Sequence, residues 1–156
     1  MVSIRRATAA DAATVHALMC ELAGHQGQRS AVSVSVDRMR ELLARPEITY
    51  LIAERNGRAI GYVSWLVRVS LWSGGDYLAL DDLFVREGER GHGVGERLMG
   101  AVAEVADGRV IRWEVAAANE AAQRFYQRIG AGLIPKMICR WQVEAGAAAE
   151  SWHAGH

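Results

Sequence analysis

A glycine-rich run, Arg90-Gly91-His92-Gly93-Val94-Gly95, has the residue types of an anion-binding loop. It lies between a segment with strand character and a segment with helical spacing. The first N–H groups of a helix have no partner within the helix, and the helix dipole is positive at that end. Glycines let the main chain approach a ligand without clashes from Cβ atoms. The junction therefore predicts a pyrophosphate site, to which Arg90 would add a charge-assisted contact.

The same run could also be a loop that binds nothing, because glycine-rich turns between strands and helices are common. It is not a Walker loop, since no Gly-Lys-Ser/Thr sequence ends it. Its glycines are at positions 91, 93 and 95, which differs from the Gly-x-Gly-x-x-Gly spacing of dinucleotide-binding folds. Taken alone, the run leaves both readings open.

Two adjacent carboxylates, Asp81 and Asp82, precede this loop on a predicted strand. A carboxylate can take a proton from an ammonium group, directly or through water, and it also attracts a cation. Successive side chains of a strand point to opposite faces, so only one of the two acids can face a substrate unless a bulge intervenes. Alternatively, either acid is a solvated charge at a strand end or half of a salt bridge.

The elements that must position these residues follow from the apolar spacing. Thr8 is expected to cap a first helix, with Asp11 at the third position and Gly24 as its stop. Asn56-Gly57 predicts a hairpin turn. The other expected helices are 36–44, 94–106 and 119–129, and the expected strands are 2–6, 48–54, 61–71, 77–85, 110–116 and 137–143.

The order β-α-α-β-β-β-α-β-α-β predicts an α/β fold with a mixed, mostly antiparallel sheet flanked by helices. The length of 156 residues predicts one domain, over residues 1–143. Residues 144–156 are rich in Ala and Gly and lack periodic apolar positions, which predicts a disordered tail.

The composition restricts the partners. Lys+Arg and Asp+Glu both number 18, so no net field favours nucleic acid or an anionic membrane. The chain has no signal-like start and no long apolar run, from which we expect a cytoplasmic protein. None of the five histidines has metal-ligand spacing, and we expect no metal.

Three motifs resemble the GNAT superfamily of N-acetyltransferases. Arg-x-x-Gly-x-Gly at 90–95, after Leu83-Phe84-Val85, resembles its acetyl-CoA signature. The segment from Asn119 to Ala131 is similar to the family's Asn-x-x-Ala-x-x-Phe-Tyr-x-x-x-Gly. The opening from Ile4 to Asp11 resembles the family's first strand and helix start. The resemblance covers residues 2–143 and implies a GNAT-like fold with acetyl-CoA as co-substrate.

The resemblance also implies where the co-substrate binds. The strand 77–85 and the strand after the glycine-loop helix would splay apart, and the pantetheine arm would pair with the main chain in that gap. Asn119 would contact the co-substrate through its amide or serve only as a helix N-cap. The expected binding residues are Leu83, Phe84, Val85, Arg90, Gly91, His92, Gly93, Val94, Gly95, Glu96, Asn119 and Tyr126.

Three residues are candidates for catalysis. Tyr126 resembles the family's general acid, which protonates the departing thiolate, and a phenol with a pKa of about 10 suits that task. The alternative is a packed aromatic residue beside Phe125. The run from Leu80 to Val85 resembles the diamine (spermidine/spermine) acetyltransferase branch, in which an acid occupies the position of Asp81. Asp81 is therefore the preferred base and Asp82 the second choice.

The resemblance predicts acetyl transfer to a primary amine of a small molecule by direct attack in a ternary complex. The acceptor would be a diamine or polyamine, an amino-acid-like amine or an amino-bearing antibiotic. The alternatives are a protein or peptide N-acetyltransferase and an acyl-CoA-binding sensor without turnover. Trp65 or Trp72 could line an acceptor pocket, although strand tryptophans are more often core or dimer contacts. The family also suggests a homodimer.

Overall fold

The computed structural model describes residues 1–146 of the chain. It divides into two compact units, Met1–Ala116 and the part from Ala117 onward. Of the predicted disordered tail, residues 147–156 lie outside the described part. The prediction of a single domain over residues 1–143 stays a prediction.

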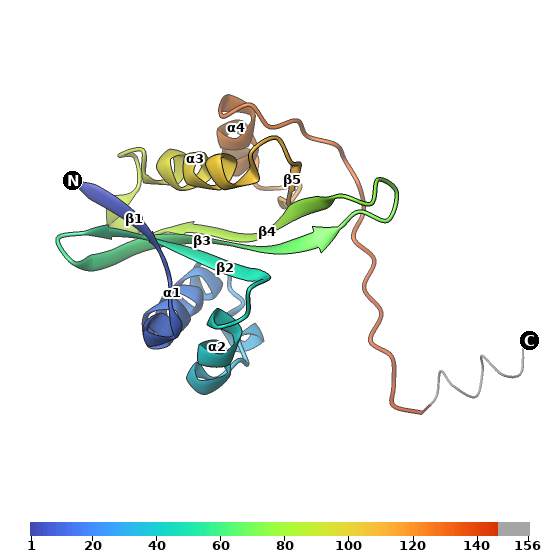
Figure 1. Cartoon of the computed structure of the whole chain (residues 1–156), viewed down its shortest axis with the longest axis horizontal. Helices are drawn as coiled ribbons and strands as arrows, with labels where there is room; N and C mark the ends of the chain where they lie inside the picture. The colour runs from blue at the N-terminus through green and yellow to red at the C-terminus, as the bar shows by residue number, and fades with distance from the viewer. Residues whose placement is uncertain (147–156) are drawn as a thin grey trace, which may run out of the picture. The chain divides into compact units, whose positions relative to one another are not determined.

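The first unit is built on a five-stranded sheet in the order β1-β2-β3-β4-β5 (Figure 1). The first four strands are antiparallel neighbours, and β5 pairs with β4 in parallel. The predicted mixed, mostly antiparallel sheet is confirmed. The strands are β1 (Val2–Arg6), β2 (Ile48–Arg55), β3 (Arg58–Val69), β4 (Asp76–Val85) and β5 (Ile111–Arg112).

Helices cover both faces of this sheet. The helices α1 (Ala12–His25) and α2 (Val36–Leu43) lie on one face, and α3 (Val94–Ala106) lies on the other (Figure 1). Short 3-10 turns lie in the connections: Ala9–Asp11 between β1 and α1, Arg29–Ala31 between α1 and α2, and Glu87–Glu89 between β4 and α3. The core on the α1 and α2 face includes Leu18, Met39, Ile52, Tyr62 and Phe84.

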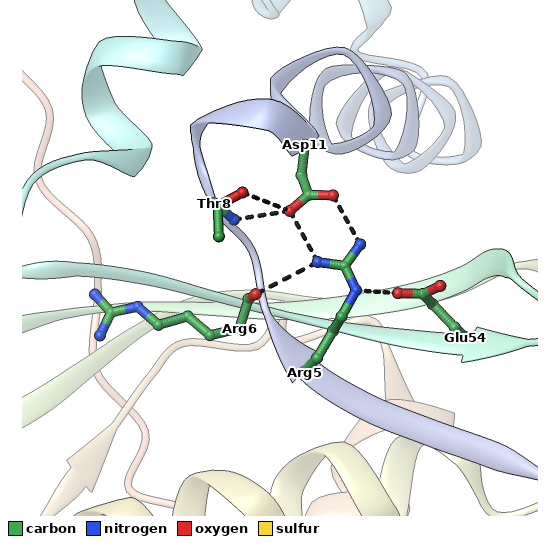
Figure 2. Close-up of polar contacts among 5 residues, drawn as sticks. All are labelled: Arg5, Arg6, Thr8, Asp11 and Glu54. Atoms are coloured by element: carbon green, nitrogen blue, oxygen red, sulfur yellow. Dashed lines mark hydrogen bonds and ion pairs between the residues drawn. The ribbon is translucent and has the colours of Figure 1, made fainter.

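The predicted capping residues hold the start of the first helical segment against β1. The Thr8 main-chain N–H donates to Asp11 Oδ2 at 2.7 Å. The Arg5 guanidinium donates to both oxygens of Asp11, at 2.7 and 2.9 Å, and also contacts Glu54 of β2 (Figure 2). These bonds, that from Arg5 above all, lower the pKa of Asp11 to about 2.

Two hairpins connect the central strands. At the predicted turn between β2 and β3, Asn56 and Gly57 both have positive φ, as a tight hairpin turn requires. The pairing of β3 with β4 is interrupted once, because Ser64 lies opposite Asp82 whereas Trp65 lies opposite Leu80. Asp81 is therefore the extra residue of a β-bulge.

The second unit contains α4 (Glu120–Arg128). Asn119 caps this helix as predicted, since its Oδ1 accepts from the Ala122 main-chain N–H at 3.1 Å. The predicted strand 137–143 is wrong, because residues 131–143 form no regular element. Strand-forming side chains become a strand only where another strand supplies hydrogen bonds, and within residues 1–146 none pairs with this segment.

The strand predicted at 110–116 is shorter than expected. Only Ile111 and Arg112 pair with β4, opposite Leu78 and Ala79. Beyond Ala79, the outer edge of β4 has no strand partner within residues 1–146. Among the same residues, no helix combines the length and the apolar character needed to cross a membrane.

Candidate active site

The β-bulge places the two predicted acids on one side of β4. Asp82 lies on the α1 and α2 face, where its Oδ2 accepts a hydrogen bond from the buried Tyr62 hydroxyl at 2.9 Å. Asp81 is exposed and lines a hollow on the same face, together with Tyr50 and Ser64. A regular strand would have sent the two carboxylates to opposite faces. The sequence left open whether a bulge interrupts this strand. The bulge is present, and it brings both acids to the same face.

The surroundings of Asp82 affect its protonation. Burial raises the pKa of Asp82, and the neighbouring charge of Asp81 raises it further. The hydrogen bond from Tyr62 acts in the opposite direction and lowers that pKa, because it favours the ionised carboxylate. The main-chain N–H of Asp82 donates to Ser64 Oγ at 3.2 Å, which holds the bulge in place.

Two tyrosines that sequence reasoning missed form the wall behind Asp82. The rings of Tyr50 and Tyr62 stack with their centroids 5.6 Å apart. Burial, followed by the charges of Asp82 and Asp81, raises the pKa of Tyr50 to about 12. Burial, the charge of Asp82 and the hydrogen bond to Asp82 raise the pKa of Tyr62 as well, so both phenols stay protonated hydrogen-bond donors at neutral pH. Both tyrosines lie on strands that the sequence predicted, but nothing in the sequence paired Tyr62 with an acid twenty residues away.

The hollow beside the acids has a volume of about 350 Å³. It lies between the end of α2 and the central strands. Its size is at the lower end of the range for small-molecule sites. Apolar, hydroxyl and charged side chains line it: Leu42, Arg45, Glu47, Ile48, Tyr50, Ser64, Trp65, Leu66 and Asp81.

The open edge of β4 lies where the resemblance predicted a place for pantetheine. The Arg86 N–H donates to the Ile60 carbonyl of β3 at 2.8 Å. Because main-chain groups alternate along an antiparallel strand, Phe84 also faces β3, whereas Leu83 and Val85 face the open edge. Arg90 Nε donates to the Val85 carbonyl at 2.8 Å. Of the three predicted residues, Leu83 and Val85 can therefore offer main-chain groups to a ligand.

The predicted anion loop has the backbone conformation of a cradle at the start of α3. Gly91 and Gly93 have φ values of 81° and 77°, in the region that side chains disfavour. Gly93 is the N-cap of α3 and has no side chain to cover the helix end. His92 and Glu96 are exposed, whereas the Val94 side chain is buried and can contribute only its main chain. Gly95 lies in the first turn of α3.

These features fit a CoA thioester. The glycines and the first turn of α3 would hold its pyrophosphate, and the outward main-chain groups of Leu83 and Val85 would pair with its amides. The Arg90 side chain lies against the end of β4, with its guanidinium carbon 5.9 Å from the centre of the Phe84 ring. The loop, the strand edge and the acids all belong to the first unit.

The other two predicted residues belong to the second unit. Tyr126 is half-buried on α4, and its ring centroid lies 5.4 Å from that of Phe125. Asn119 uses its side-chain oxygen to cap α4. Of the tryptophans considered for an acceptor pocket, Trp65 is buried and lines the hollow, whereas Trp72 is fully exposed between β3 and β4 and does not line it.

Comparison with known proteins identifies the family and agrees with the fold. Residues 16–131 match the acetyltransferase (GNAT) family. No curated protein sequence matches the chain. Three similar structures are an aminoglycoside acetyltransferase, meta-AAC0020, from an uncultured soil metagenomic sample in complex with sisomicin, a ribosomal-protein-alanine N-acetyltransferase from Brucella melitensis biovar Abortus 2308, and the aminoglycoside N-acetyltransferase AAC(6')-Iy in complex with CoA.

The similarity to these structures extends over nearly the whole chain. The soil enzyme has a TM-score of 0.78 at 14% identity, covering 92% of this chain and 96% of its own. The Brucella enzyme has a TM-score of 0.72 at 20% identity, covering 91% of this chain and 100% of its own. The CoA complex has a TM-score of 0.73 at 20% identity, covering 91% of this chain and 95% of its own.

The fold and the family match together define an acyl-group transferase. The chain belongs to the acetyltransferase (GNAT) family. The predicted enzyme class and acetyl-CoA as co-substrate are confirmed at the level of that family. The family match does not distinguish the diamine branch from the others.

Proposed function

We propose that this chain transfers an acetyl group from acetyl-CoA to a primary amine of a small molecule. The observation that carries the proposal is the β-bulge, which sets Asp81 and Asp82 on one face of the sheet. Both carboxylates lie near a hollow suited to a small ligand, and together they would attract an ammonium group.

The acids would prepare the amine for attack. A protonated amine first gives one proton to a carboxylate, directly or through water. Its free electron pair then forms a bond to the thioester carbonyl carbon, and the carbon–sulfur bond breaks with its electrons left on sulfur. The nitrogen loses a second proton, the thiolate gains one, and the products are an N-acetylated amine and free CoA.

The environments of the two acids favour a division of roles. Burial raises the pKa of Asp82 toward the pH at which the enzyme would work, which is what a general base requires. Asp81 is exposed at the bulge and is better suited to attract and orient the cation. We therefore assign the base to Asp82 and binding of the ammonium group to Asp81, which reverses the order that the resemblance alone suggested.

Protonation of the leaving thiolate is assigned to Tyr126. The resemblance of residues 119–131 to the family's segment supports this role, as does the half-buried position of the phenol on α4. Asn119 is proposed to contact the co-substrate as well as to cap α4. Because its Oδ1 accepts from Ala122, its amide nitrogen is the group that would make that contact.

The acceptor class and the oligomeric state are further parts of the proposal. Diamines, amino-acid-like amines and amino-bearing antibiotics all carry the required ammonium group. A homodimer is supported by Leu71 and Trp72, apolar side chains that are 94% and 102% exposed between β3 and β4. Analytical ultracentrifugation of the wild type and Trp72→Ser tests this point, and a wild-type monomer at micromolar concentration would contradict it.

The experiment for the activity measures thiol release from acetyl-CoA against a panel of amines. The wild type and Tyr126→Phe are compared, with acetyl-CoA binding measured separately by calorimetry. We expect turnover of at least one amine class, and a lower kcat in the variant with unchanged binding. Binding of acetyl-CoA without turnover of any amine would contradict the proposed reaction, and absence of binding would contradict the assignment of residues 90–95.

A further inference from the structure

An ion pair at the rim of the hollow indicates what else the acceptor carries besides its amine. Arg45 and Glu47 both line the hollow and follow the end of α2. Arg45 Nε and Nη2 both point at Glu47 Oε1, each at 2.6 Å. A guanidinium offers five N–H groups, and this arrangement uses only one edge of it.

The other edge of the Arg45 guanidinium remains available to a ligand. Within residues 1–146, Nη1 has no protein acceptor. The two terminal nitrogens of a guanidinium form a fork that matches the two oxygens of a carboxylate. Arg45 can therefore keep its bond to Glu47 and bind a second carboxylate end-on.

The main chain holds this ion pair in a fixed place. The Arg45 N–H donates to the Leu42 carbonyl at 3.1 Å, and the Arg45 carbonyl accepts from Ile48 at 3.3 Å. The Glu47 carbonyl accepts from Val67 of β3 at 3.0 Å. Pro46 between them fixes one more backbone angle. The turn is thus attached both to α2 and to the sheet, and its side chains are presented to the hollow from a rigid backbone.

The charges of the hollow are arranged asymmetrically. Asp81 carries a negative charge beside the bulge, with Asp82 behind it. At the rim, the negative charge of Glu47 is neutralised by Arg45. An occupant with ammonium groups at both ends would place one of them against the Arg45 guanidinium. An occupant with an ammonium group and a carboxylate would meet an opposite charge at each end.

We propose that the hollow binds an amine that also carries a carboxylate, with the ammonium group at Asp81 and the carboxylate on the Arg45 fork. This inference rests on the proposed function and narrows its acceptor to the amino-acid-like class. Arg45 is then the residue that determines specificity, and it selects against diamines.

Three amines of matched length test the inference. Pentylamine carries one ammonium group on a five-carbon chain. Cadaverine adds a second ammonium group at the far end, and 6-aminohexanoate carries a carboxylate there. The wild type should acetylate 6-aminohexanoate with a kcat/KM about tenfold above that of pentylamine, because each charge-assisted hydrogen bond contributes appreciably. Cadaverine should be the poorest of the three.

Arg45→Gln should invert this preference. Loss of the fork lowers kcat/KM for 6-aminohexanoate, and the unneutralised Glu47 raises it for cadaverine. The double variant Arg45→Gln/Glu47→Gln should act on all three amines about equally. Arg40→Gln is the matched control, because Arg40 lies in the last turn of α2, has the same 52% side-chain exposure as Arg45, pairs with Asp37 at 2.6 Å and does not line the hollow.

The outcomes separate this inference from the function on which it rests. Inversion by Arg45→Gln, with Arg40→Gln behaving as the wild type, supports it. Turnover of the amines with cadaverine preferred, or with the same ratios in Arg45→Gln, overturns the inference and leaves the acetyltransferase activity standing. No turnover of the three amines, together with no calorimetric binding of 6-aminohexanoate to the protein saturated with acetyl-CoA, overturns this acceptor class altogether. Turnover of other amines in the wider panel would then show that the proposed function survives without it.

Discussion

The glycine loop at 90–95 and the acidic bulge at 81–82 lie on neighbouring stretches of the first unit, and we propose that they work by different means. The loop would act through its main chain, since Gly91 and Gly93 have a left-handed conformation at the start of α3. The bulge would act through side chains, which it directs to one face of the sheet. In the proposed function, co-substrate recognition would therefore depend on backbone shape, and acceptor recognition would depend on the charge and placement of a few residues.

This difference predicts what variation each region should tolerate. A substitution in the loop matters when it disturbs φ values, whereas a substitution at the bulge matters when it changes a charge or a hydrogen bond. Variants of the first kind should weaken acetyl-CoA binding and spare the amine. Variants of the second kind should do the reverse.

The largest effect is expected at the half-buried acid, Asp82. Asp82→Asn should lower kcat/KM for the amine about 100-fold, because the general base is lost while its shape is kept. Asp81→Asn should act mainly through a higher KM, since its role is to attract the ammonium group. Steady-state kinetics at saturating acetyl-CoA measure both. A larger loss of kcat in Asp81→Asn would exchange the two roles.

The next effect concerns the loop. Gly93→Ala places a Cβ atom at a φ of 77°, which costs about 1–2 kcal/mol. Acetyl-CoA binding should therefore weaken about tenfold, with little change in the KM of the amine. Calorimetric titration with acetyl-CoA checks this.

Gly100→Ala is the matched control for the loop variant. Gly100 lies within α3, is exposed and has open space where a Cβ would be placed. Alanine there should leave binding unchanged and raise the free energy of unfolding by up to about 1 kcal/mol. Equal binding losses in both variants would indicate that α3 stability, and not the loop conformation, controls affinity.

A smaller effect, visible in the pH profile, is expected at Tyr62. Its hydrogen bond lowers the pKa of Asp82, so Tyr62→Phe should raise that pKa. A base is active when ionised. The acidic limb of the pH profile of kcat/KM should therefore move to higher pH. Tyr50→Phe is the control, because the Tyr50 hydroxyl donates to the Met19 sulfur and not to Asp82. If the acidic limb of Tyr62→Phe lies at the same pH as that of the wild type, Asp82 is not the base.

The smallest effect concerns stability, far from either region. Asp11→Asn should lower the free energy of unfolding by about 1 kcal/mol at pH 7, a figure kept small because Arg5 is half-exposed. The depressed pKa of about 2 means that the stabilisation is complete above the ordinary carboxyl range and declines as the pH falls toward 2.

Urea unfolding measures the free energy of unfolding at pH 7 and pH 3. The difference in this free energy between the wild type and Asp11→Asn should be smaller at pH 3. Asp37→Asn, in an exposed pair on α2, should change stability by less than about 0.5 kcal/mol. A difference for Asp11→Asn that is the same at both pH values would contradict the ionic origin of the effect.

The sequence predicted the parts of the site that depend on residue type. The glycine loop, the residues of α3 and the cap of α4 by Asn119 were all predicted from local signals, because glycine and asparagine have specific backbone and capping preferences. The presence of two acids on β4 was equally plain from the sequence.

The parts that depend on pairing between distant strands were not predicted. No residue type marks Asp81 as the extra residue of a bulge, which is set by the register between β3 and β4. The contact between Tyr62 and Asp82 and the hollow at Arg45 depend on the same register. The strand predicted at 137–143 failed for a related reason, since alternation of side chains does not supply a pairing partner.

The central claim is that the two acids act on the amine while the loop holds acetyl-CoA. The most direct test measures both properties on one protein, the double variant Asp81→Asn/Asp82→Asn. We predict acetyl-CoA affinity within about twofold of the wild type, as the loop is untouched, and loss of nearly all amine acetylation. Retained acetylation with wild-type kinetics would contradict the claim.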